Sequence, residues 1–166
     1  MKKNICLSIV LIILAGSLYS QNSIVTDEIN ELVWKPFIKS FAAGDEAGFR
    51  AVHSKDVTRV IQDDNQVLGY DQYFKKEPDS VKAKWGNWKK SIELRFLQRI
   101  SGNDRAFEVG YYKTTSTNTQ TGEIRTGIGM FHVLLRKENG VWKILMDADT
   151  KEGAGEEVFS KAKPME

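Results

Sequence analysis

The chain has 166 residues, 24 of them basic and 22 acidic, and its formal net charge is +2. So small a surplus argues against a nucleic-acid partner, because proteins that bind phosphate backbones carry clustered, strongly basic surfaces. The single cysteine, Cys6, excludes an internal disulfide, and a chain of this length corresponds to about one domain.

The N-terminus has the pattern of a secretory signal peptide. Two lysines precede the apolar run 5–16, and small residues follow it up to Ser20. This run is shorter than the about 20 residues that a membrane-spanning helix needs. We therefore expect cleavage after Ser20, no membrane anchor in the product, and export to the periplasm or the medium. Cleavage would remove Cys6 and two lysines, which leaves a formally neutral chain.

We expect the exported product to contain one folded domain over residues 21–150 and a polar tail over residues 151–166. The tail should fray because it is polar, and one turn of helix could form in it.

The first predicted element is a long helix over residues 26–45, with Thr26 as its N-cap. At 100° per residue, its apolar side chains cover most of the circumference, which is typical of a helix that is buried on most sides. Pro36 lacks a backbone donor and should kink this helix. Gly44 should end it.

Less regular patterns follow this helix. Asp45 should cap a short second helix over residues 46–56, and a strand is predicted over 57–62. A third helical stretch is expected over 69–74. Residues 76–90 have no clear periodicity, so their structure stays open.

Four segments with β patterning then complete the domain. They are joined by turn residues and cover residues 91–100, 105–116, 123–137 and 140–150. Helices followed by a run of hairpin-connected strands indicate an α+β domain with a largely antiparallel sheet.

Asn139-Gly140 predicts a type I′ turn between the last two strands. With these two residues as the loop, His132 lies opposite Asp147 on the face that is turned away from the main core. The pair could be a catalytic dyad. Without a third group and a cavity, an ordinary cross-strand pair worth about 0.2–1 kcal/mol is the favoured interpretation. We expect this outer face to pack against a second copy of the chain, through Met130, His132, Leu134, Leu145 and Asp147.

The order of several short motifs resembles the nuclear transport factor 2-like superfamily, in particular its SnoaL-like small exported bacterial members. The motifs are AAGD at the end of the first helix, FRAVHSKDV after it and NGVWKILMDAD in the last hairpin. The resemblance implies a cone-shaped fold, in which a strongly curved antiparallel sheet wraps around a long N-terminal helix with two further short helices. It also implies a pocket at the wide end and frequent dimerisation through the outer sheet face. Such folds host both enzymes and binding modules, so function stays open.

Established catalytic motifs are absent from the sequence: there is no GxSxG, no HExxH and no phosphate-binding GxxxxGK. Two histidines far apart argue against a histidine-based metal site. Asp63-Asp64-Asn65 could contribute to a carboxylate-only site, but a turn is the favoured interpretation. We expect neither a cofactor nor a metal.

Strand alternation and the expected cone place eight residues in the pocket. His53 shares an apolar helix face and could titrate near neutral pH, although a core histidine bonded to a backbone carbonyl is the more common case. Gln98, Tyr111 and Arg125 could bind a polar or anionic ligand, or lie at the sheet rim in water. The expected lining is His53, Tyr73, Trp88, Gln98, Tyr111, Arg125, Trp142 and Met146.

Three functions are compatible with these features. The leading one is a non-catalytic domain that binds a small molecule in a mostly apolar pocket. The second is a ketosteroid-isomerase-like or dehydratase-like enzyme that uses a pocket acid or base such as His53 with Tyr111 as a hydrogen-bond donor. The third is a dimeric module without a cavity that supports another exported protein. The predicted register turns Asp147 and Asp149 outward, which counts against the enzyme.

Overall fold

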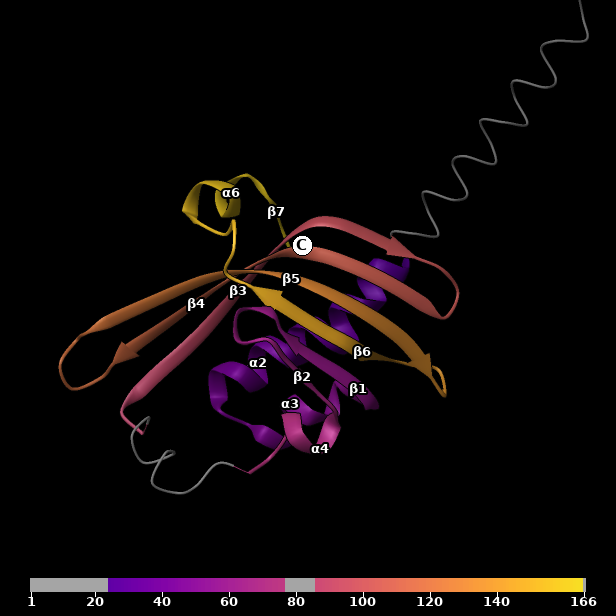
Figure 1. Cartoon of the computed structure of the whole chain (residues 1–166), viewed down its shortest axis with the longest axis horizontal. Coiled ribbons are helices and arrows are strands. Elements are labelled where there is room, and N and C mark those ends of the chain that lie inside the picture. Colours follow the sequence, from indigo (N-terminus) through magenta and orange to yellow (C-terminus); the bar gives the residue numbers. More distant parts are fainter. Residues whose placement is uncertain (1–23, 77–85, 166) are drawn as a thin grey trace, which may run out of the picture.

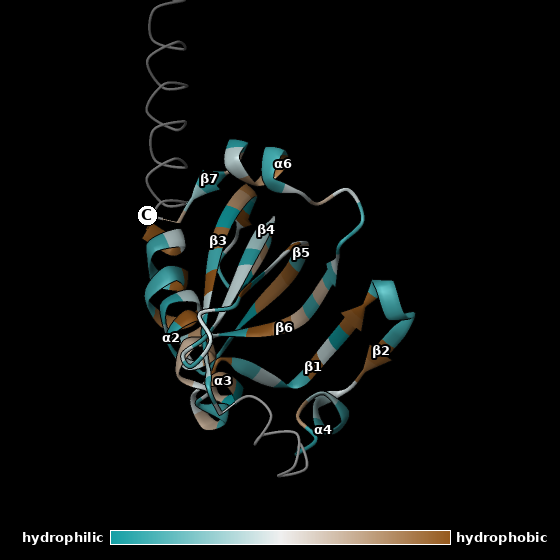
Figure 2. Ribbon diagram, turned by 90° about the vertical axis from the view of Figure 1, so that its left-hand side faces the viewer, coloured by the Kyte–Doolittle hydropathy of each residue, from teal (hydrophilic) through white to brown (hydrophobic). Residues whose placement is uncertain are grey.

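The computed structural model describes residues 24–76 and 86–165 (Figure 1). The predicted signal peptide and most of the stretch 76–90 lie outside this part of the chain. Within it, no helix is long and apolar enough to cross a membrane. The fold is α+β, as predicted, with the N-terminal helices against the concave side of one curved sheet and a C-terminal helix on the other side (Figures 1 and 2).

The long N-terminal helix is continuous but not uniform. Residues 24–29 are α-helical, a π-helical turn η1 covers Asn30–Trp34, and α2 covers Lys35–Ala43. The backbone N–H of Lys35 bonds to the carbonyl of Asn30, five residues back. This wider turn lies directly before Pro36, whose ring would clash with the preceding carbonyls of a regular α-helix. The predicted cap at Thr26 is wrong, because the chain is already helical at residue 24.

The end of this helix follows the sequence prediction. Gly44 has φ +65°, a left-handed conformation that glycine adopts without strain. Asp45 then caps α3, Glu46–Ala51, by accepting a hydrogen bond from the backbone N–H of Gly48.

The segment after α3 is extended earlier than expected. The predicted helix over 46–56 ends at Ala51, and β1 runs from His53 to Ile61. A 3-10 turn η2, Gln62–Asp64, leads into the short strand β2, Gln66–Leu68, which was not predicted. The helix α4, Tyr70–Tyr73, confirms the third helical stretch.

The remaining strands form the body of the sheet. They are β3 (Trp88–Ser101), β4 (Arg105–Asn118), β5 (Ile124–Glu138) and β6 (Val141–Thr150). The strand order in the described residues is β2-β1-β6-β5-β4-β3-β7, and all neighbours are antiparallel except β1 and β6 (Figure 2). The turn between β5 and β6 has positive φ at Asn139 and Gly140, as a type I′ turn requires.

β-Bulges interrupt the alternation in two of these long strands. The pairing of β3 with β4 shifts between Phe96 and Gln98, and the pairing of β6 with β5 shifts at Leu145. A bulge places two residues of one strand opposite one residue of its partner, so every side chain after it changes face relative to simple alternation. These two shifts decide which polar residues point into the cone.

The core lies between the N-terminal helix and the concave sheet face. Its largest fully buried side chains come from both layers: Ile29, Val33, Val57, Val133, Leu135, Trp142 and Ile144. Burial of such side chains on both partners contributes the main stabilisation of a two-layer domain. The helix is buried along the side that faces the sheet, but Leu32 is 42% exposed and residues 31, 35 and 39 are exposed, so the predicted burial on most sides is confirmed only for the sheet-facing side.

One carboxylate is buried inside this core. Glu108 is 1% exposed and accepts hydrogen bonds from Arg99 Nε (2.8 Å) and Trp34 Nε1 (2.6 Å). Arg99 also donates to Asn30 Oδ1 at 2.7 Å, so the network ties the helix to β3 and β4. Burial raises the pKa of Glu108, and the charge and hydrogen bond of Arg99 oppose this shift.

The C-terminal tail is ordered by tertiary contacts, so the prediction that it frays is wrong. Helix α6, Glu156–Lys161, lies on the outer sheet face, and β7, Lys163–Pro164, pairs with β3. Phe159 is 2% exposed and packs with Tyr111 and Ala162. The buried ring of Phe159, together with the pairing of β7 with β3, holds this mostly polar segment against the sheet.

Candidate functional site

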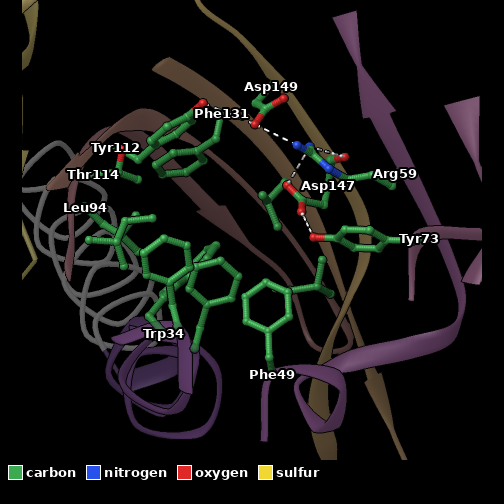
Figure 3. Close-up of a pocket in the computed structure, with 15 residues that line it drawn as sticks. Trp34, Phe49, Arg59, Tyr73, Leu94, Tyr112, Thr114, Phe131, Asp147 and Asp149 are labelled. Atoms are coloured by element: carbon green, nitrogen blue, oxygen red, sulfur yellow. Dashed lines mark hydrogen bonds and ion pairs between the residues drawn. The ribbon is translucent and has the colours of Figure 1, made fainter. Parts of the chain in front are cut away.

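A cavity of about 250 Å³ opens on the concave side of the sheet, between the N-terminal helix, α3, α4 and the strands (Figure 3). Most of its lining is apolar or aromatic, and the polar residues gather on one wall. The apolar part consists of Trp34, Phe37, Phe41, Phe49, Ile92, Leu94, Phe131, Val133 and Ile144. The polar part consists of Arg59, Tyr73, Tyr112, Thr114, Asp147 and Asp149.

The polar wall is built around Arg59 on β1, whose guanidinium lies between two carboxylates of β6. Nη2 donates to Asp149 Oδ2 at 2.7 Å, and Nη1 lies 3.4 Å from Asp147 Oδ1. Nη1 also donates to the backbone oxygens of Asp147 and Val60. Because β1 and β6 are parallel neighbours with Arg59 beside Asp147 in the register, the three side chains lie on the same face.

Two tyrosines complete this wall by donating to the carboxylates. Tyr73 of α4 donates its hydroxyl proton to Asp147 Oδ2 at 2.9 Å, and Tyr112 of β4 donates to Asp149 Oδ2 at 3.3 Å. The ring of Tyr112 lies over Gly129 of β5, where a Cβ atom would come within 2.4 Å of it. The missing side chain at Gly129 therefore lets Tyr112 reach across β5 to Asp149 on β6.

The environment shifts the pKa of three of these groups. Burial alone would lower the pKa of Arg59, but the charge of Asp147 and the hydrogen bond to Asp149 outweigh it and raise this pKa. Burial and the charge of Asp147 raise the pKa of Tyr73 well above its ordinary value. Burial and the charge of Asp149 raise the pKa of Tyr112 to about 12. Both phenols therefore keep their protons near neutral pH and act as donors.

The bulge at Leu145 overturns the predicted register beyond the hairpin turn. Leu135 pairs with Ile144 as predicted, but Asp147 pairs with Val133 and His132 pairs with Ala148. The His132–Asp147 pair does not exist, because the extra residue in β6 turns Asp147 to the concave face. Asp147 and Asp149 thus line the cavity, whereas the predicted register had placed both side chains on the outer face.

His53 is a core histidine rather than a pocket residue. It is 4% exposed, and its Nδ1 lies 2.7 Å from the backbone oxygen of Phe49. Aromatic rings surround it, among them Phe37 and Tyr73, and Nε2 has no hydrogen-bond partner among the described residues. Burial lowers the pKa of His53, which opposes protonation near neutral pH.

Gln98, Tyr111 and Met146 were expected to point inward and point outward instead. Gln98 and Met146 each follow a bulge, which reverses their face. Tyr111 packs against Phe159 on the outer face. The wrong assignment in β4 has a physical reason: its outward residues are more apolar than its inward ones, because the C-terminal segment covers part of the outer face.

The other expected lining residues have mixed positions. Tyr73 lines the cavity, as predicted. Trp142 points inward but is fully buried, and its Nε1 donates to Glu28. Trp88 and Arg125 stack at 4.5 Å on the concave side, beyond the cavity toward the tip of the β4–β5 hairpin.

The outer face also differs from the predicted dimer surface. Asp147 lies on the concave face instead, and Met130 packs against the buried residues Tyr111, Phe159 and Ala162. The outward row that remains uncovered runs across four strands through the pairs Ile100–Phe107, Phe107–Leu134 and Leu134–Met146. Ile100 is 55% exposed.

Sequence reasoning missed Arg59, Tyr112 and Asp149 as site residues. Alternation in the strand 57–62 would have placed Arg59 on the same face as Val57, which is a usable signal. The inward position of Asp149 had no local signal. The arrangement offers hydrogen-bond acceptors, hydrogen-bond donors and two carboxylates at the edge of an apolar cavity. The described residues hold no group of three or more His, Cys, Asp or Glu side chains that could bind a metal.

No family model matches the sequence, and no curated protein is significantly similar to it. Solved structures share its fold. The protein Aln2 from a Streptomyces species aligns with a TM-score of 0.64 and 12% identity over 77% of this chain and 90% of that one. A nuclear transport factor 2-like superfamily protein from Salmonella enterica has a TM-score of 0.59 and 15% identity, with coverage of 77% and 91%. A ketosteroid isomerase-like protein from Erwinia carotovora atroseptica has a TM-score of 0.52 and 16% identity, over 74% of this chain and 95% of that one. At such identities the likeness establishes the fold alone.

Proposed function

Because the chain has the nuclear transport factor 2-like fold that its sequence indicated, with a cavity on the concave side, we propose that it binds a small molecule there. The observation that supports this most directly is the composition of the lining. Apolar and aromatic side chains form most of the cavity, and a few convergent polar groups occupy one wall. That composition is typical of ligand sites.

The size of the cavity limits the ligand. Its volume of about 250 Å³ lies below the roughly 300–1,000 Å³ of most drug-sized sites, so the ligand is small. The apolar side chains would bury its body, and the Arg59–Asp147–Asp149 group would orient a polar head.

A cavity-filling variant tests the proposal. Ile92 lines the cavity, so Ile92→Trp should occupy it. Leu97→Trp is the matched control, because Leu97 lies in the same strand and is 53% exposed. We expect native mass spectrometry or ligand-observed NMR with small aromatic fragments to detect binding to the wild type and to Leu97→Trp, and not to Ile92→Trp. Equal binding to all three proteins, or to none, would contradict the proposal.

A proton-transfer enzyme is the second candidate, and a specific observation favours it. The bulge at Leu145 places Asp147 and Asp149 in the cavity, where either carboxylate could accept a proton from a ligand, and a tyrosine hydroxyl bonded to each one orients it. One solved structure of similar fold is named ketosteroid isomerase-like. The activity that such a site would support is abstraction of a proton next to a carbonyl group.

Deuterium exchange tests this activity without knowledge of the substrate. The methyl protons of acetophenone should exchange faster in D₂O with the wild type than with Asp147→Asn or Asp149→Asn, as followed by NMR. Asp64→Asn, at an exposed position in η2, is the control for the loss of one charge. Exchange at the rate of the buffer alone would leave the protein as a non-catalytic binding domain.

We also propose that two copies pair through the outer sheet face. The uncovered apolar row that ends in Ile100 and Met146 is the surface that a second copy would bury. Light scattering should give twice the protomer mass for the wild type and a monomer for Leu134→Lys in the middle of this row. A wild-type monomer at micromolar concentration would exclude the dimer.

Export completes the proposal and rests on the N-terminal pattern of residues 1–20. Mass spectrometry of the protein from an expressing bacterium should find a chain that begins at Gln21 in the periplasm or the medium. A full-length chain in the cytoplasm would contradict it.

A further inference from the structure

The charged residues of the cavity lining do not balance. Among the described residues that line the cavity, Arg59 is the only cation and Asp147 and Asp149 are both anions, so the formal charge of this described lining is −1. The other lining side chains are neutral. A ligand with a carboxylate or phosphate would therefore enter a site whose net charge repels it.

Arg59 is poorly placed to bind an anionic ligand. Its Nη1 faces two backbone oxygens and Asp147 Oδ1, and its Nη2 donates to Asp149 Oδ2. An anion that took both Nη groups would have to displace Asp147 or Asp149, and an anion at the remaining N–H groups would lie next to these two carboxylates, which repel it. Displacement would leave a carboxylate without its partner in a partly buried site, which is costly.

The hydroxyl protons of the wall are also in use. Tyr73 donates to Asp147, Tyr112 donates to Asp149, and Thr114 Oγ1 donates to the backbone oxygen of Gly127 at 3.3 Å. These three oxygens keep lone pairs that can accept. The wall therefore has an excess of acceptors over donors.

The aromatic rings on the side of the cavity opposite the polar wall favour a ligand that is neutral or cationic. Trp34 and Phe49 lie across the cavity from the polar wall, and Phe131 lies beside it (Figure 3). The faces of aromatic rings carry partial negative charge and attract cations, most strongly where water is excluded.

We propose that the ligand of this cavity is a small apolar or aromatic compound whose polar head donates hydrogen bonds, a protonated amine above all and an alcohol second, and that carboxylates are excluded. The inference rests on the proposed ligand-binding function and narrows it. Of the polar or anionic ligand that the sequence left open, it keeps the polar alternative, because Arg125, the cation among the residues considered for an anion, lies beyond the cavity.

Three probes of nearly equal size test the proposal: benzylamine, benzyl alcohol and benzoate. Their affinities for the full chain as purified would be measured by ligand-observed NMR titration at pH 7 and low salt. We expect benzylamine to bind best, benzyl alcohol next, and benzoate at least about tenfold more weakly than benzylamine. Ile92→Trp should abolish all three interactions, which places the probes in the cavity.

Charge-removing variants test the cause of the preference. Asp149→Asn should reduce the ratio of benzylamine to benzoate affinity at least about threefold, and Asp147→Asn should do the same if the first variant fails to fold. Asp64→Asn outside the lining should leave the ratio unchanged. Benzoate binding as tightly as benzylamine overturns the inference and leaves the proposed binding function in place. Failure of all three probes to bind overturns both.

Discussion

Replacement of Arg59 by methionine is the sharpest test of how the polar wall is held together. The change removes the cation that lies between Asp147 and Asp149 and keeps much of the apolar stem. The two carboxylates, 15% and 19% exposed, would then face one another without a counter-charge.

The expected loss of stability follows from this burial. Removing one partner of a buried ion pair costs about 3–5 kcal/mol, and the remaining solvent contact of the carboxylates places Arg59→Met at the lower end, about 3 kcal/mol. With a urea m-value of about 1.5–2 kcal/mol/M, the unfolding midpoint should fall by about 1.5–2 M. Tryptophan fluorescence can follow the transition, because Trp34 lines the cavity and Trp142 is fully buried.

Two further variants separate the charge effect from packing. Arg59→Lys keeps the charge but loses the planar fork, so it should lose less stability than Arg59→Met. The triple variant Arg59→Met, Asp147→Asn, Asp149→Asn has no buried charge on this wall and should recover more than half of the loss. A loss below about 1 kcal/mol for Arg59→Met, or a triple variant less stable than the single one, would refute the reasoning.

Three other predictions concern single sites. Burial lowers the pKa of His53, so as the pH falls the unfolded chain binds this proton before the folded chain does. The free energy of unfolding should therefore fall as the pH drops below about 6.5, by at most about 1.4 kcal/mol per pH unit. In urea titrations at pH 5 to 8, His53→Gln should remove this slope, and an unchanged slope would contradict the assignment. Gly110→Ala should lower the free energy of unfolding by about 3 kcal/mol in thermal or urea unfolding, because the added Cβ would lie 2.1 Å from the backbone oxygen of Arg95. Gly102→Ala is the control, because a Cβ there would make only an ordinary contact. It should change the free energy of unfolding by less than about 0.5 kcal/mol. Phe159→Ala should cost about 3–5 kcal/mol and speed proteolysis of the C-terminal tail, whereas a frayed tail would show no change.

The elements of this fold were largely predictable because their signals are local. The apolar pattern around Trp34 predicted the N-terminal helix, and Gly44-Asp45 predicted the break between two helices. Asn139-Gly140 predicted the last hairpin, and the register was correct as far as the pair Leu135–Ile144. Each of these features depends on residues that are close to one another in the sequence.

The site was not predictable in the same way. Extrapolated alternation placed Asp147 and Asp149 outside and Met146 inside, and the single extra residue at Leu145 reversed all three. The phase of alternation was also misjudged in β4, where the outward Tyr111 is covered by the C-terminal segment.

The sequence by itself determined the class of fold, the positions of most helices and long strands, and the sharp turns at Gly44 and Asn139-Gly140, because hydrophobic periodicity and glycine conformations act over a few residues. Only the tertiary structure decided which carboxylates enter the cavity, that Arg59 of β1 lies between them, and that Tyr112 reaches them across Gly129. The physical reason is that a β-bulge and the curvature it supports depend on the partner strand and on the layer packed behind it. One inserted residue in a ladder leaves the composition of the strand unchanged and yet reverses the face of every side chain that follows.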